Sequence, residues 1–233
     1  MSEPPKPRVL VIMDVDGTMI KNGDALRVPF YQAFEEVTGA NIRGVKVNFA
    51  GNTDRAIIRQ FIEVSGVNGD YEDLLARFAD RFCELVDGSY DSHPSPRLLP
   101  GVRDLLEALR QHPEAALVLG TGNIRRSCEI KLRRFELLDY FPHGGGFGGD
   151  HEVRADAIRA AMEVGREAYG WDGEAWVIGD TPNDAIAAHD AGARTLLVAT
   201  GMIRKENLEY ADAEHVLDDL TDTARVMEIL GLA

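Results

Sequence analysis

The chain has 233 residues, of which 45% are hydrophobic and 27% are charged, a composition typical of globular proteins. Its formal net charge of −14 repels the phosphates of nucleic acids and of anionic membranes, so neither is an expected partner. The same charge repels small phosphorylated ligands, and a site for such a ligand therefore needs a local cation.

Features of the whole chain indicate a cytoplasmic protein. Its two cysteines, Cys83 and Cys128, fall within predicted helices and fit reduced, packed thiols better than a disulfide framework. No apolar stretch is long enough to span a bilayer. Residues 1–7 are expected to form a polar, proline-rich tail and not a signal peptide. The sequence leaves open whether the protein is a monomer or a homodimer.

After Arg8, residues 9–13 form a continuous apolar run, which predicts a short strand buried on both faces. The run stops at Asp14, and Asp16, Gly17 and Thr18 follow. In open α/β sheets ligands bind beyond the carboxyl ends of the strands, so this pair of carboxylates is placed for chemistry. A turn with a capping aspartate is the alternative, and it explains one of the two aspartates better than both.

Helical patterns replace the strand pattern from residue 19 to about residue 97. The spacing of apolar residues predicts helices over residues 25–38, from a cap at Thr53 or Asp54 to residue 65, and over residues 71–86. Residues 87–96 are rich in turn-forming residues and predict a linker. This region therefore reads as a helical insert.

Strands and helices alternate again from Leu99. The predicted strands cover residues 116–120, 175–178, 195–198 and 215–217, with a further short strand within residues 141–149. The predicted helices cover residues 101–111, 124–138, 154–169 and 183–191, and a last helix runs from Thr221 or Asp222 to residue 230. This alternation predicts a mostly parallel sheet with helices on both faces.

Polar residues follow two further strands at the same predicted edge of the sheet. Thr121, Gly122 and Asn123 follow one strand and could bind a phosphate, although an ordinary strand-to-helix turn has the same pattern. Asp180 and Asp184 follow another, and helix capping accounts for only one of them. Because the carboxyl ends of parallel strands share one edge, these side chains are expected to converge with Asp14 and Asp16.

Together these segments resemble the motifs of the haloacid dehalogenase-like superfamily: Asp14–Thr18, the strand ending at Thr121, and Gly179–Ala193. The resemblance implies an α/β fold with a Rossmann-like core over residues 1–18 and 98–233. It also implies that residues 19–97 form an α-helical cap domain of the type found in phosphoglycolate phosphatases and β-phosphoglucomutases.

The resemblance implies a Mg²⁺-dependent phosphatase that acts on a small phosphorylated metabolite. Asp14 would be the nucleophile and form an aspartyl-phosphate, and Asp16 would act first as general acid and then as general base. Mg²⁺ suits an oxygen-only set of ligands from Asp14, the Asp16 carbonyl and Asp180. Asp184 would be either a further ligand or a group that holds the basic side chain Arg154. The implied phosphate-binding residues are Gly17, Thr121, Gly122, Asn123 and Arg154.

Two of these positions carry further information. Asp16 favours a phosphate ester as substrate, because a halide leaving group needs no proton. The lysine that is usual ahead of the helix at residues 154–169 is absent, and Arg154 stands in its place. A surface role for Arg154 is the alternative, in which case Arg125, Arg126 or Lys131 would supply the charge.

Specificity is expected in the loop that leads into the second helix of the insert, where Asn52 and Arg55 are candidate substrate contacts. A plain helix cap with Arg55 in solvent is the alternative. Two other functions use the same groups: a sugar phosphomutase of the β-phosphoglucomutase type, and a phospho-accepting module like a receiver domain.

Overall fold

The structure, a computed structural model, describes residues 6–42 and 44–233. Residues 1–5 of the predicted N-terminal tail lie outside the described residues. Within the described part, no helix is long and apolar enough to cross a membrane.

A six-stranded parallel sheet forms the larger part of the molecule, with the order β5-β4-β1-β6-β7-β8. Its strands are β1 (Val9–Met13), β4 (Ala115–Thr121), β5 (Gly145–Phe147), β6 (Glu174–Gly179), β7 (Arg194–Val198) and β8 (His215–Leu217). The central strand β1 pairs Val9 with Ala115 of β4 and with Glu174 of β6, so three strands end at nearly the same level. The prediction of a parallel α/β sheet is confirmed.

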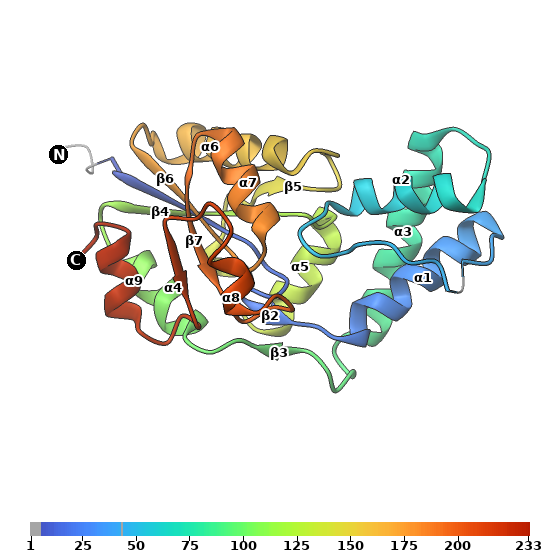
Figure 1. Cartoon of the computed structure of the whole chain (residues 1–233), viewed down its shortest axis with the longest axis horizontal. Coiled ribbons are helices and arrows are strands. Elements are labelled where there is room, and N and C mark those ends of the chain that lie inside the picture. The colour runs from blue at the N-terminus through green and yellow to red at the C-terminus, as the bar shows by residue number, and fades with distance from the viewer. Residues whose placement is uncertain (1–5, 43) are drawn as a thin grey trace.

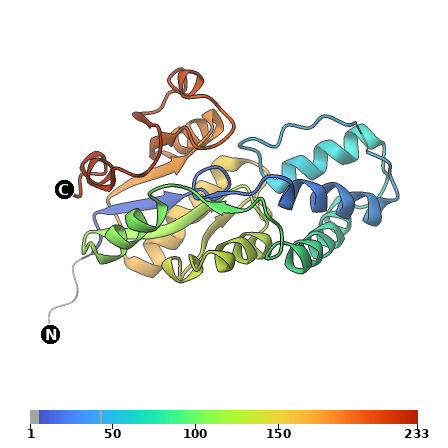
Figure 2. The ribbon, with the colours of Figure 1, turned by 90° about the horizontal axis from the view of Figure 1, so that it is seen from below.

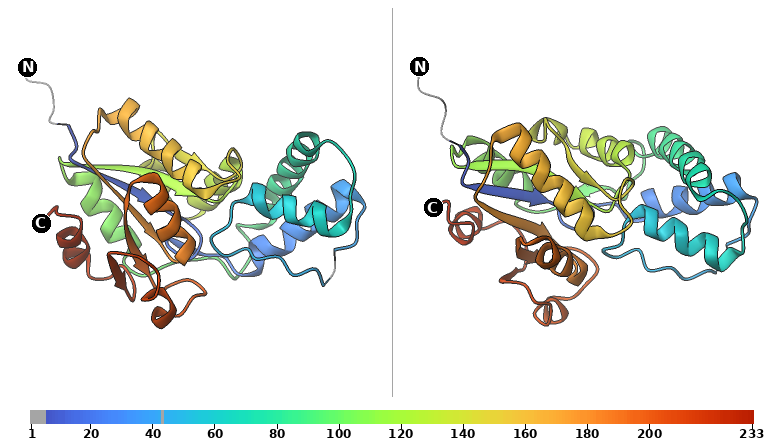
Figure 3. Two further views of the ribbon diagram at one scale, coloured as in Figure 1. Left: turned by 45° about the horizontal axis from the view of Figure 1, so that its top comes forward. Right: turned by 90° about the horizontal axis from the view of Figure 1, so that it is seen from above.

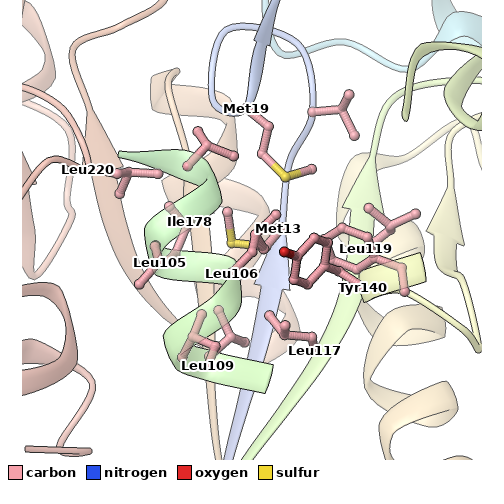
Figure 4. Close-up of a cluster of buried hydrophobic side chains, with 14 of the residues drawn as sticks. Met13, Met19, Leu105, Leu106, Leu109, Leu117, Leu119, Tyr140, Ile178 and Leu220 are labelled. Carbon is pink, nitrogen blue, oxygen red and sulfur yellow. The ribbon is translucent and has the colours of Figure 1, made fainter. Parts of the chain in front are cut away.

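Helices cover both faces of the sheet (Figure 1). On one face lie α6 (Arg154–Tyr169) and α7 (Pro182–Ala191), which pack on Leu10 and Ile12 of β1 and their neighbours. On the other face lie α4 (Val102–Gln111), α5 (Arg125–Arg134) and α9 (Thr223–Ile229). Figure 4 shows the second core, in which Met13 of β1 lies among leucines of α4 and β4. Successive residues of β1 thus serve opposite cores, as the alternation of a strand requires.

The insert forms a separate helical layer beyond the end of the sheet (Figures 2 and 3). It contains α1 (Asp24–Thr38), α2 (Asp54–Ser65) and α3 (Tyr71–Ser89), whose apolar faces enclose their own core of buried rings and aliphatic side chains. Thr53 caps α2 by accepting a hydrogen bond from the Ala56 N–H at 3.1 Å. The boundaries of the cap at residues 19 and 97 stay a prediction.

Two short strands join the insert to the sheet. The strand β2 (Ile20–Lys21) leads into the insert and pairs antiparallel with β3 (Arg97–Leu98), which leads out of it. These strands and the four-residue helix α8 (Lys205–Leu208) were not predicted, because segments this short carry no readable periodicity.

One predicted helix ends earlier than its pattern suggests. The segment predicted as a helix over residues 124–138 ends as α5 at Arg134, and Leu138–Tyr140 form the separate 3₁₀ helix η1. Glu136 lies between them with a φ of 56°, a left-handed backbone conformation that stops an α-helix. The apolar pattern continues across this break, which explains the overestimate.

Candidate active site

Three adjacent strand ends build the site. Asp14 follows the central strand β1, Thr121 is the last residue of β4, and Asp180 follows β6. The Asp14 N–H donates to the Ile178 carbonyl of β6 at 3.0 Å, which continues the sheet pairing beyond the last residue of β1. The sheet topology therefore brings the sequence-predicted residues of all three segments to one edge.

Three buried carboxylates meet at this edge. One oxygen from each of Asp14, Asp180 and Asp184 lies within 4.8 Å of the others. Burial, together with the charges of Asp184 and Asp16 and against the opposing effect of Arg154, raises the pKa of Asp14 to about 7. Burial and the charges of Asp184 and Asp14 also raise the pKa of Asp180. The cluster therefore carries more negative charge than its protein surroundings neutralise.

Two glycines make room for the Asp180 carboxylate. A Cβ atom at Gly17 or at Gly201 would overlap that carboxylate, and Gly17 also has a φ of 90°. The Thr18 hydroxyl donates to Asp180 Oδ1 at 3.3 Å. The loop after β1 thus wraps closely around a carboxylate from β6, which fixes the position of both.

These carboxylates fit a magnesium ion. Hard divalent cations prefer several carboxylate and carbonyl oxygens, and the three oxygens of Asp14, Asp180 and Asp184 converge on one point. The raised pKa values of Asp14 and Asp180 share two causes, burial first and then the repulsion of each by the Asp184 carboxylate. A bound cation would remove that repulsion.

Arg154 lies at the centre of the cluster. Its Nη2 atom is 3.0 Å from Asp14 Oδ1 and 2.6 Å from Asp184 Oδ1. Burial lowers the pKa of Arg154, but the carboxylates of Asp184 and Asp14 outweigh this and raise it overall. Among the described residues, Arg154 Nε is one of two buried side-chain polar atoms without a hydrogen-bond partner. Such a donor in the site suits an anionic ligand.

The other cations weighed for this role lie elsewhere. Arg125 and Arg126 are exposed, and the Arg125 guanidinium lies over the Phe147 ring at 4.1 Å from its centroid. Lys131 is fully buried, but it contacts Asp16 and not Asp14.

Asp184 holds Arg154 in position. While Oδ1 accepts from Arg154, Oδ2 accepts from the Thr181 N–H at 3.0 Å and from the Thr181 hydroxyl at 2.7 Å. Asp184 thereby also completes the N-terminal cap of α7. Both of its oxygens are engaged in the structure, and one of them also belongs to the carboxylate cluster.

A lysine inside α5 anchors the Asp16 carboxylate. Lys131 Nζ donates to both Asp16 oxygens and to Asn123 Oδ1, each at 2.7 Å. Asn22 Nδ2 donates to Asp16 Oδ1 at 2.5 Å, and Asn123 Nδ2 donates to the Thr121 hydroxyl at 2.5 Å. A chain of hydrogen bonds therefore links Asp16 to the predicted phosphate-binding turn.

From the sequence, Lys131 is only one of three alternatives to Arg154 as the cation of the site. A signal for its burial exists, because Lys131 lies three residues after Cys128 on the buried face of α5. A lysine on an apolar face is ordinarily explained by exposure of its head group, so the sequence does not reveal the carboxylate partner.

The cap loop contacts the core at the predicted phosphate-binding turn. The Asp54 N–H donates to the Gly122 carbonyl at 2.7 Å, and Asp54 Oδ2 accepts from the Ile124 N–H at 2.7 Å. Asn52 of this loop lines the cavity, and its side chain donates to the Asn48 carbonyl at 2.8 Å. The cap is thus closed over the site, with Asp54 as a contact that the sequence did not single out.

Arg55, a predicted substrate contact, is engaged within the insert in this structure, and its role at the site stays a prediction. Its guanidinium pairs with Glu72 on the neighbouring helix of the insert and lies 5.2 Å from the centre of the Tyr71 ring. It is not among the residues that line the site's cavity. The α2–α3 packing, which is not readable from a loop position, holds Arg55 away from the site.

A cavity of about 640 Å³ extends from the carboxylates to the cap. The predicted site residues among its lining are Asp14, Asp16, Gly17, Asn52, Thr121, Gly122, Asn123, Arg154 and Asp180. This volume lies within the range of small-molecule binding sites.

Comparisons with known proteins identify similar chains. A model of the family described as haloacid dehalogenase-like hydrolase matches residues 11–198. A phosphoglycolate phosphatase of Vibrio vulnificus is 26% identical over 94% of this chain and 95% of its own length. The structure of a predicted phosphatase from Clostridium acetobutylicum superposes with a TM-score of 0.68 at 19% identity, covering 95% of this chain and 99% of that one. The structure of CbbY from Rhodobacter sphaeroides in complex with phosphate gives a TM-score of 0.66 at 19% identity, covering 93% and 96%.

The buried Asp54 should make stability depend on pH. Burial raises its pKa to about 7, although the Ile124 N–H and Lys131 oppose this. A carboxyl with a higher pKa in the folded state stabilises the fold when protonated, so this contribution is lost as the pH rises from about 4 through about 7. Asp54→Asn cannot ionise. Its Tm relative to wild type should therefore rise across this range by roughly 2 °C or more, measured by thermal unfolding in metal-free buffer.

The matched control is Asp80→Asn on an exposed position of α3, for which the Tm difference from wild type should stay constant with pH. A constant difference for Asp54→Asn as well would contradict the assignment of a buried, proton-binding carboxyl at the cap–core contact.

Proposed function

This chain belongs to the haloacid dehalogenase-like hydrolases, and on that premise we propose that it is a Mg²⁺-dependent phosphatase that cleaves a small phosphorylated metabolite through an aspartyl-phosphate. The enzyme class, a phosphoric monoester hydrolase of this family, is confirmed by the family match and by the phosphatases that the chain resembles. The observation that carries the finer proposal is the convergence of Asp14, Asp16 and Arg154 at one sheet edge.

In the first step, an Asp14 oxygen attacks the phosphorus atom and the bond from phosphorus to the ester oxygen breaks. The leaving alcohol oxygen takes a proton from the Asp16 carboxyl, which Lys131 and Asn22 hold in place. Arg154 neutralises part of the charge on Asp14 and the transferring group.

In the second step, water attacks the phosphorus atom of the aspartyl-phosphate while Asp16 takes its proton. The bond between phosphorus and the Asp14 oxygen breaks, which releases inorganic phosphate and restores the carboxylate. Mg²⁺ held by Asp14, the Asp16 carbonyl and Asp180, with Asp184 beside them, would supply positive charge to the phosphoryl oxygens. The net charge of −14 makes such a local cation necessary for binding a phosphate ester.

The proposed partner is a small phosphorylated metabolite, in keeping with the phosphoglycolate phosphatases among the relatives. We also propose that the enzyme acts in the cytoplasm, where its two cysteines, both buried as free thiols, would stay reduced.

Asp14→Asn keeps the shape of the nucleophile but removes its charge. Phosphate release from phenyl phosphate with Mg²⁺ should fall roughly a thousandfold or more. Release by the wild type should also stop with excess chelator and return with added Mg²⁺. The matched control, Asp212→Asn, changes a side chain that is 93% exposed and should leave turnover unchanged.

Two further readouts distinguish the other functions. Isomerisation of a sugar phosphate without net phosphate release would favour the phosphomutase. A phosphoprotein that persists for hours would favour the receiver-like module. Near-normal turnover by Asp14→Asn would reject an aspartyl-phosphate on Asp14 altogether.

Asp16→Asn should slow both steps, because acid and base are lost together. A phenol needs less protonation to leave than an alkyl alcohol. The defect in forming the aspartyl-phosphate should therefore be at least tenfold smaller for phenyl phosphate than for an alkyl phosphate, as roughly expected for loss of a general acid. Single-turnover kinetics with both esters measures this step. Equal defects would leave Asp16 with a structural role only.

Arg154→Ala should lower kcat/KM roughly a hundredfold, because it removes the guanidinium that contacts Asp14. Arg154→Lys should recover activity to within about tenfold of wild type, since the charge remains while the fork is lost. Arg159→Ala on the same helix, at a half-exposed position, is the control and should be silent. If Arg154→Ala is silent instead, another cation fills the family's lysine position.

A further inference from the structure

The cavity above the carboxylates has two chemically different ends. One end is polar and contains Asp14, Arg154 and the turn from Thr121 to Asn123. The other end lies under the cap and is lined by side chains of α1, α2, α3 and the loop between α1 and α2. Because the polar end takes the phosphoryl group, the cap end receives the alcohol part of the ester. This step rests on the proposed phosphatase function.

Apolar side chains dominate the cap end. They are Leu26, Phe30, Val47, Phe49, Ile57 and Phe82. Phe30, Ile57 and Phe82 are at most 3% exposed and form the floor of this end, whereas Leu26, Val47 and Phe49 are half-buried. We use "leaving-group chamber" for the space bounded by these six residues. Such a wall stabilises apolar atoms and gives no hydrogen bonds to a carboxylate.

The chamber is held rigid by contacts between its aromatic rings. The Phe30 ring lies 5.3 Å from the Phe49 ring and 5.1 Å from the Phe82 ring, both edge to face. Phe30 also lies 4.7 Å from Phe78 in the interior of the insert. A floor fixed in this way is present before a ligand binds, so little ordering opposes binding.

Few cations line the cavity that contains this wall. In the described part of the chain, the cations that line the cavity are Lys21, Arg27 and Arg154. Arg154 is already engaged by Asp14 and Asp184. Lys21 belongs to β2 and Arg27 to the first turn of α1, and the Arg27 side chain is 70% exposed.

We propose that the enzyme selects phosphate monoesters whose alcohol carries an extended apolar group, which the leaving-group chamber buries between the cap helices. The whole cavity has a volume of about 640 Å³, which leaves room for more than a two-carbon acid and its phosphate. A polar end of such an alcohol could be met by Lys21 or Arg27, the lining cations outside the carboxylate cluster. This substrate class differs from the one named for the phosphoglycolate phosphatases that the chain resembles.

The test is a series of straight-chain esters: ethyl, butyl and hexyl phosphate. Their alcohols have similar acidity, so differences in kcat/KM report contacts of the chain and not chemical reactivity. Burial of each added methylene should raise kcat/KM about threefold to fourfold. Phosphoglycolate should be a poorer substrate than hexyl phosphate. Hexylphosphonate, which cannot be hydrolysed, should bind more tightly than ethylphosphonate and with a more negative heat-capacity change in calorimetry.

Two variants connect the effect to the chamber wall. Leu26→Gln keeps the length and helix propensity of the side chain, and Val47→Thr keeps its shape. Each should reduce the gain per methylene to about twofold or less. Val28→Gln on the same helix is the matched control, because Val28 is 57% exposed and does not line the cavity. It should leave the series unchanged.

The outcomes separate this inference from the proposed function. Phosphate release that is flat or falls with chain length, with phosphoglycolate as the best substrate, would overturn the apolar substrate class and keep the phosphatase. An unchanged chain-length series in both folded wall variants would also overturn it. If no ester releases phosphate, the proposed function fails, while tighter binding of the longer phosphonate would still support the chamber.

Discussion

The crowding of three carboxylates at one sheet edge is the constraint on which the rest of the structure depends. Asp14, Asp180 and Asp184 are each at most 4% exposed, and their oxygens lie within 4.8 Å of one another. Buried like charges repel, so such a cluster persists only where the surrounding fold compensates for it. The compensation is specific: Arg154 lies between Asp14 and Asp184, and the N–H and hydroxyl of Thr181 also donate to Asp184. The Thr18 hydroxyl donates to Asp180. The remaining excess of negative charge suits a cation.

The sequence predicts the parts of this site that follow from local pattern and topology. Asp14 and Asp180 are readable because each ends a buried strand, and parallel strands end at one edge. The buried positions of Lys131 and Asp54 cannot be predicted from the sequence, because the burial of a charged side chain depends on a partner far away in the chain. The partner is Asp16 for Lys131 and the Ile124 N–H for Asp54. The pairing of Arg55 cannot be predicted for the same reason, since its partner Glu72 lies seventeen residues later.

The turn from Thr121 to Asn123 connects the two halves of the molecule. Its Gly122 carbonyl accepts from the Asp54 N–H of the cap, and a Cβ atom at Gly122 would overlap the Asn52 carbonyl. Asn123 also accepts from Lys131, which binds Asp16. The proposed phosphate-binding turn is therefore also the docking point of the cap and part of the support of the proposed general acid. An ordinary strand-to-helix turn would require none of these contacts.

This shared turn implies a division of tasks between the two layers. In the proposed function, groups at the sheet edge act on the phosphoryl group, which every phosphate monoester has in common, and these groups are fixed by strand pairing and short hydrogen bonds. The insert contributes the apolar wall. Dispersion attraction to this wall is short-ranged, so it depends on the shape of the alcohol and not on its charge. Because Asp54 docks this wall on the turn beside Thr121, the wall is in place only when the cap is closed. On these two proposals, an ester that fills the chamber would stabilise closure and closure would exclude water from the carboxylates, so the fit of the alcohol would act on the chemistry of its phosphate.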